Sequence, residues 1–167
     1  AKVGDELDRI GYRGTSPCPG PSPRAFVELH IEQGPVLEVE GVTIGAVTGV
    51  QGISWTELTL IGHSNHAGTT PMSLRRDPMR VAAEVVVAAR SIASEMGGSQ
   101  VATVGSLNLH PNLVNVVPAS ATMTVDLRNT DEGLLQLAEE QLRARVAGIA
   151  EDEDVRVESR SLARYEP

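Results

Sequence analysis

The sequence contains few aromatic residues and a single cysteine, and both shortages exclude classes of function. Aromatic residues make up 2% of the 167 residues, which leaves no set of rings on which nucleic-acid bases could stack. Acidic residues outnumber basic ones by 22 to 14, and the resulting net charge of −8 also argues against nucleic acid as a partner. Because Cys18 is the only cysteine, no internal disulfide can form, and the chain fits a reducing, cytoplasmic location.

Long hydrophobic runs are also missing. No apolar stretch approaches the roughly 18 residues that a membrane-spanning helix needs, and no signal peptide opens the chain, so we expect no membrane partner. The chain begins at Ala1 and finishes in mid-pattern at Pro167, which is typical of an excised segment. We therefore expect part of a longer protein.

Residues 1–50 have an irregular pattern. Leu7 and Ile10 predict a short helix over 1–13, a loop rich in Pro, Gly and Ser follows over 15–23, and the composition of 25–31 and 42–50 favours β-structure. Between these two β segments, residues 32–37 are typical of a turn or short helix.

Residues 51–161 are far more regular. The order of predicted elements is a strand over 53–61, a helix beginning at Asp77-Pro78, strands over 101–109 and 119–128, a helix capped by 130–132, and a last strand at 155–157. Strict alternation over 119–128 predicts that Ala121, Met123 and Val125 are buried. This β-α-β-β-α-β order indicates an α+β, ferredoxin-like fold with an antiparallel four-stranded sheet and two helices on one face.

Two histidines follow strand-like runs and stand next to turn-forming residues. His30 is flanked by carboxylates and followed by Gln33-Gly34-Pro35, where Gln33 can both donate to and accept from a polar ligand. His66 lies in a loop of small polar residues and could stabilise a developing oxyanion, or simply satisfy its own loop. A structural role for His30 is the corresponding alternative.

Asn115 and Arg128 are the remaining candidates. Asn115 lies in a proline-bounded loop, where it could instead cap its own turn, and Arg128 ends the clearest strand on its polar face, where it could be a surface arginine. One strand length could carry both residues along one side of a site. A guanidinium fork is a natural receptor for a substrate carboxylate.

Several motifs, in order, resemble one family. They are the segment from Phe26 to Glu38 that contains His30-Ile31-Glu32-Gln33-Gly34-Pro35, then Asn65-His66-Ala67-Gly68-Thr69-Thr70-Pro71-Met72, Arg75-Arg76-Asp77, Asn115-Val116-Val117-Pro118 and Asp126-Leu127-Arg128. Together they resemble the N-carbamoyl-L-amino acid hydrolases, allantoate amidohydrolases and β-ureidopropionases, a family of amidases.

This resemblance implies a two-domain hydrolase with two zinc or manganese ions per subunit and a smaller lid domain that dimerises. Residues 1–50 would be a fragment of the α/β catalytic domain, 51–161 the lid, and 162–167 the return to the catalytic domain. His30 would be a metal ligand, Gln33 a substrate contact and His66 a catalytic residue donated to the partner subunit.

By the same resemblance, Asn115 would contact the oxyanion or substrate, and Arg128 would hold the substrate carboxylate. The other metal ligands and the general base of the family are absent from this chain, so the fragment should be inactive alone. The expected substrate is a small ureido carboxylate, cleaved at the ureido C–N bond. Two alternatives stay open: a metallo-exopeptidase of the same clan, and a non-catalytic dimerisation or ligand-binding module.

Overall fold

The computed structural model describes residues 2–17 and 19–167, and it divides into two compact units, 1–46 and 47–167. Cys18, and with it the expectation for that residue, lies outside the described residues. Within the described ranges, no helix is both long enough and apolar enough to cross a membrane.

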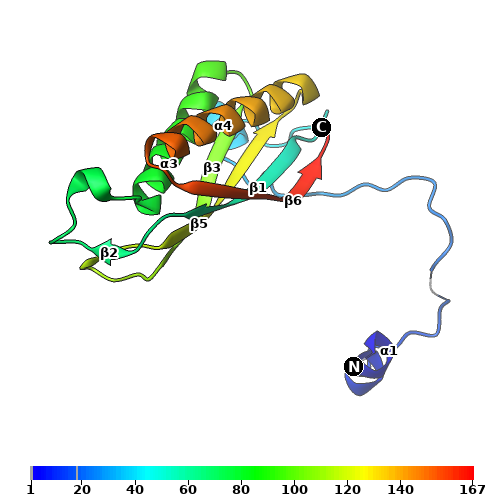
Figure 1. Ribbon diagram of the computed structural model, residues 1–167. Coiled ribbons are helices and arrows are strands. Elements are labelled where there is room, and N and C mark those ends of the chain that lie inside the picture. The colour runs from blue at the N-terminus through cyan, green and yellow to red at the C-terminus, as the bar shows by residue number, and fades with distance from the viewer. Residues whose placement is uncertain (1, 18) are drawn as a thin grey trace. The chain divides into compact units, whose positions relative to one another are not determined.

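The second unit has the fold that the sequence predicts. Its four long strands lie in the order β3-β5-β1-β6, and every neighbouring pair is antiparallel. Two long helices, α3 and α4, cover one face of this sheet (Figure 1). The main elements are β1 (Gly52–Ile61), α3 (Pro78–Met96), β3 (Val101–His110), β5 (Ser120–Asn129), α4 (Glu132–Asp152) and β6 (Arg156–Tyr165). The ferredoxin-like prediction is therefore confirmed.

Alternation along the central strands places the core between sheet and helices. Ala121, Met123 and Val125 of β5 are at most 1% exposed, whereas the residues between them face the other side, as predicted. Leu58 of β1 pairs with Met123, so the buried faces of the two strands coincide. A shift of one residue in this pairing would bring threonines under the helices.

Both long helices begin at the predicted caps. The Asp77 carboxylate accepts a hydrogen bond from the Met79 amide at 2.9 Å, and the Asp131 carboxylate accepts one from the Leu134 amide at 2.8 Å. These bonds satisfy amide groups that lack a partner in the first helical turn. Pro78 at the first helical position needs no such partner, which makes Asp77-Pro78 a strong start signal.

The first unit contains less regular structure than expected. It holds two short helices, α1 (Val3–Arg9) and α2 (Val36–Glu40), and the segments 25–31 and 42–50 are not strands. Neither apolar anchor of the first helix is fully buried, and Ile10 is 49% exposed. Strands require a paired neighbour to satisfy their amides and carbonyls, and the described residues provide none for these segments.

Two further differences lie in the second unit. The segment around His66, expected to be a loop, contains a two-residue strand, β2 (Asn65–His66), which pairs with β4 (Val116–Val117), and a short 3-10 helix, η1 (Met72–Leu74), follows. The last strand is ten residues long, far longer than the predicted 155–157. It ends beside the start of β1, where Tyr165 is opposite Ile53.

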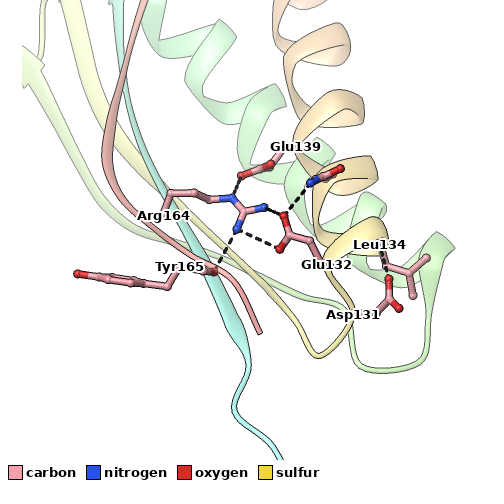
Figure 2. Close-up of polar contacts among 7 residues, drawn as sticks. Asp131, Glu132, Leu134, Glu139, Arg164 and Tyr165 are labelled. Atoms are coloured by element: carbon pink, nitrogen blue, oxygen red, sulfur yellow. Dashed lines mark hydrogen bonds and ion pairs between the residues drawn. The ribbon is translucent and has the colours of Figure 1, made fainter.

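An ion cluster joins the end of β6 to α4. Figure 2 shows the Arg164 guanidinium between two carboxylates of α4, with Nη2 at 2.5 Å from Glu132 and Nε at 2.8 Å from Glu139. Hydrogen bonding to Arg164 holds the pKa of Glu132 below its ordinary value. The cluster thus joins the C-terminal end of β6 to the N-terminal part of α4.

Candidate functional site

His66 and Asn115 meet where two short strands extend from one end of the main sheet. In the β2–β4 pair, His66 lies opposite Val116, and the next amide, that of Ala67, donates to the Asn115 carbonyl at 2.9 Å. Figure 1 shows this pair of segments reaching beyond the helices. Both side chains are exposed. The structure therefore brings together two residues that are 49 positions apart in the sequence.

The His66 ring is oriented by its own loop. The Gly68 amide donates to Nδ1 of His66 at 3.0 Å, so this nitrogen carries a lone pair and, in the neutral ring, the proton is on Nε2. Gly68 permits this approach, because an added Cβ there would be 3.3 Å from Cε1 of the ring. His66 therefore presents an N–H donor to the solvent.

Arg75 also stabilises this loop, through hydrogen bonds to its main-chain carbonyls. Its Nη2 donates to the Ala67 carbonyl at 2.6 Å and to the Thr70 carbonyl at 3.0 Å, and its Nε donates to the Thr70 carbonyl at 3.1 Å. The loop closes on itself as well, since the Thr70 amide donates to the His66 carbonyl. The sequence motif contained Arg75, but nothing in its spacing indicated that carbonyls eight and five positions earlier would be its partners.

Arg128 lies on the face of β5 that the helices do not cover. Asp126, two residues earlier on the same face, accepts from Nε at 3.1 Å and from Nη2 at 2.9 Å. The guanidinium carbon is 6.0 Å from the centre of the Trp55 ring, at the edge of cation–π range. Hydrogen bonding to Asp126 raises the pKa of Arg128, against the opposing effect of desolvation. The i, i+2 spacing of Asp126 and Arg128 was a sequence signal for this pair.

The length of β5 separates Arg128 from the other two residues. Asn115 and His66 lie at the end of the sheet where Ser120 is opposite Ile61, whereas Arg128 is opposite Ile53 at the other end. Eight residues of strand from Ser120 to Arg128 span about 26 Å. One chain therefore cannot place Arg128 and His66 against the same small molecule, contrary to the simplest interpretation of their spacing.

His30 and Gln33 lie in the first unit and are exposed. Nδ1 of His30 is 2.5 Å from the Ile31 carbonyl, which can only accept, so Nδ1 is the donor and, in the neutral ring, Nε2 carries the lone pair. This is the arrangement in which histidines bind metal ions. Gln33 has a positive φ of 57°, and the neighbouring Glu32 carboxylate accepts from the Val36 and Leu37 amides at the start of α2.

The described residues do not form a complete metal site. No group of three or more His, Cys, Asp and Glu side chains in 2–17 and 19–167 is placed to hold a metal ion. His30 can therefore supply one metal ligand, but no two further ligand side chains lie beside it in the described part of the chain. The two histidines differ in chemistry: His30 offers a lone pair to a cation, and His66 offers a proton to an anion.

A family model and the relatives found among known proteins agree with one another. Residues 48–157 match the family model described as peptidase dimerisation domain. An N-carbamoyl-L-amino acid amidohydrolase from Geobacillus stearothermophilus is 40% identical over 166 residues, covering 99% of this chain and 40% of that protein. Allantoate amidohydrolase from Escherichia coli is 42% identical over 135 residues, covering 81% of this chain and 33% of that protein.

A solved structure extends the similarity to three dimensions. A hydantoinase/carbamoylase family amidase from Burkholderia ambifaria superposes with a TM-score of 0.89 at 37% identity, covering 99% of this chain and 40% of that one. The chain thus spans about two fifths or less of the length of these relatives. The resemblance inferred from the sequence motifs is confirmed.

Proposed function

Because the chain belongs to the peptidase dimerisation domain family, we propose that it is the lid and dimerisation part, with one flanking segment, of a metal-dependent amidohydrolase. The full-length enzyme would cleave the ureido C–N bond of N-carbamoyl amino acids or allantoate-like carboxylates, the substrates named for its amidohydrolase relatives. The observation that carries the proposal is the different hydrogen bonding of the two histidines: Nδ1 of His30 contacts a carbonyl, whereas Nδ1 of His66 accepts from an amide, so their neutral rings carry the proton on opposite nitrogens.

His30 would be one ligand of a site for two zinc or manganese ions. Such ions, when bound, activate a water molecule for attack on a carbonyl-type carbon. The other ligands and the general-base glutamate would lie outside residues 1–167. The part of the reaction that this chain performs is recognition of the substrate and stabilisation of the charge that develops on it.

His66 and Asn115 would supply the donors for that charge. Attack on the ureido carbon turns its oxygen into an oxyanion, and the Nε2–H of His66 and the amide of Asn115 can both donate to it. Arg128 would receive the substrate carboxylate with its planar fork, and Gln33 would contact a polar group of the substrate. Asp126 keeps the fork of Arg128 in one orientation.

Since about 26 Å of strand separates Arg128 from the His66 end of the sheet, the two residues of one chain would serve different active sites. A homodimer with two-fold symmetry resolves this, because each site can take Arg128 from one subunit and His66 with Asn115 from the other. The distance thus makes dimerisation part of the proposed function.

The two edges of the sheet differ in their suitability for self-association. β3 contains no Asp, Glu, Lys or Arg, whereas β6 carries Arg156, Glu158, Arg160 and Arg164. Charged side chains protect an edge strand against pairing with another strand. Both edges contain a bulge, so bulges do not distinguish them. We therefore assign the dimer contact to β3, whose core-facing residues are only partly buried.

A lysine at the centre of β3 should break the dimer. In a two-fold pairing of β3 with its copy, Ser106 lies near the axis, and two lysines there would face each other across the interface. We expect Ser106→Lys to raise the dimer dissociation constant of the 167-residue chain at least about tenfold. Sedimentation over a range of concentrations measures this. The control is Ser159→Lys on β6, and dissociation by the control but not by Ser106→Lys would reverse the assignment.

The substrate class is tested on the full-length enzyme. Purified protein loaded with zinc or manganese is offered N-carbamoyl-L-amino acids, allantoate and dipeptides, and release of ammonia or free amino acid is followed. We expect turnover of at least one ureido compound and none of the dipeptides. The description of the family model as a peptidase domain makes the dipeptides the informative alternative. Turnover of dipeptides alone would replace the proposal with an exopeptidase.

A further inference from the structure

Arg75, which belongs to the motif Arg75-Arg76-Asp77 and bonds to the loop after His66, has no role in the proposed function. Arg75 makes three hydrogen bonds to two backbone carbonyls, Ala67 and Thr70, and these enclose the turn in which the His66 ring is fixed. We propose that Arg75 is a positioning residue, which acts through His66 by keeping its proton on Nε2 and its ring in one orientation. This inference rests on the proposed role of His66.

The donors of Arg75 are bonded to main-chain carbonyls and not to carboxylates. Nine other arginines of the chain form ion pairs with carboxylates, but Arg75 forms none with any residue in the described ranges 2–17 and 19–167. Its half-buried guanidinium is used entirely on main-chain oxygens. Hydrogen bonds from a charged donor are stronger than those between neutral groups, so they suit a loop without regular structure.

The loop after His66 has few other hydrogen bonds. Between His66 and Thr70 the main chain has one internal bond, from the Thr70 amide at 3.3 Å, and one bond to Asn115. The Gly68 amide, which sets the His66 tautomer, lies in the sequence between the Ala67 and Thr70 carbonyls that accept from Arg75. Release of those carbonyls would free the Gly68 peptide, and Nδ1 of His66 would lose the donor that keeps it unprotonated.

The backbone that follows Arg75 is hydrogen-bonded to other parts of the domain. The carbonyl of the next residue, Arg76, accepts from the His63 amide at 3.0 Å, and this bond does not depend on the Arg76 side chain. The Asp77 amide donates to the Glu153 carboxylate at 3.2 Å. Arg75 thus adjoins the junction between α3 and the end of α4. We expect a shift of this junction to move Arg75 and, with it, the loop.

The experiment uses Arg75→Ala with Arg76→Ala as the matched control, because Arg76 is adjacent, is also an arginine, and has a side chain that pairs with Asp154 rather than with the loop. In the 167-residue chain, nitrogen-15 NMR of His66 at about pH 8, where imidazole is neutral, reports the tautomer. Amide exchange reports the freedom of Gly68. In the full-length enzyme, kcat and KM are measured for the ureido substrate.

For Arg75→Ala we expect a mixture of His66 tautomers, Gly68 exchange at least about tenfold faster, and a fall of about tenfold in kcat with KM little changed. Arg75→Lys should lie between, since one ammonium cannot span both carbonyls as the fork does. Arg76→Ala should leave the tautomer and kcat unchanged. If Arg75→Ala does not fold, the comparison of Arg75→Lys with Arg76→Ala decides.

An unchanged tautomer and unchanged Gly68 exchange in the Arg75 variants would overturn the proposal, whatever happens to kcat. So would a changed tautomer with unchanged kcat, provided that His66→Ala itself lowers kcat. If His66→Ala has no effect on kcat, the proposed function fails instead, and the NMR result still decides whether Arg75 sets the tautomer.

Discussion

Replacing His66 by alanine in the full-length enzyme should lower kcat about 10²- to 10³-fold, which corresponds to about 2.7–4 kcal/mol of transition-state stabilisation. The reason is that the Nε2–H of His66 is a fixed donor, with Nδ1 already occupied by the Gly68 amide. A donor directed at an oxyanion is used only when the oxyanion exists, so the loss belongs in kcat and KM should change little.

The loop provides its own control for this prediction. His63 is an exposed histidine three positions earlier whose backbone amide, rather than its ring, is bonded to the Arg76 carbonyl. His63→Ala should therefore keep kcat within about twofold. Steady-state kinetics of both variants on the same ureido substrate make the comparison. Equal losses in the two variants would show that the loop is merely sensitive to substitution, and no loss in His66→Ala would remove the residue from the site.

Mixing two impaired variants should restore about half of the activity in each heterodimer, because a two-fold dimer has two sites. One variant is His66→Ala and the other is Arg128→Ala, whose loss of the carboxylate fork should cost about 2–5 kcal/mol and appear largely in KM. If each site combines Arg128 of one subunit with His66 of the other, one site in the heterodimer has both residues intact and the second has neither.

The opposite arrangement gives a different outcome. If Arg128 and His66 of the same chain served one site, each site of the heterodimer would lack one of them and mixing would restore nothing. The distance of about 26 Å along β5 is the reason to expect restoration. Subunit exchange is verified first with differently tagged chains. Confirmed exchange without recovered activity would contradict the proposed sharing of sites.

The second unit could be predicted well from the sequence because its signals are local. Asp77-Pro78 marks a helix start through a cap and a missing amide, and the alternation over 119–128 marks one buried face. The remainder of β6 escaped prediction because it is an edge strand with serines and charges on both faces, so no period-two pattern continues beyond residue 157.

The candidate site was less accessible to sequence reasoning. The two-residue ladder of β2 and β4 is too short for any periodicity, yet it alone places Asn115 beside the His66 loop. The thirteen positions between Asn115 and Arg128 gave the direction of a strand but not the fact that they stand at its two ends. The strands expected at 25–31 and 42–50 depend on pairing partners, which no local pattern can supply.

The pairing of Ile53 with Tyr165 has a consequence for how such a domain can be acquired or removed. If residues 51–161 are inserted in a catalytic domain, as a return to that domain at 162–167 would require, the two ends of the insertion are about 4.8 Å apart, which is the spacing of neighbouring strands. Because the folded domain holds its two ends together, the roughly 110 residues between Ile53 and Tyr165 add little to the entropy of closing the chain of the surrounding domain. We therefore expect that such a domain can be inserted into another protein, or replaced by a short linker, without displacing the two chain ends of the protein that carries it.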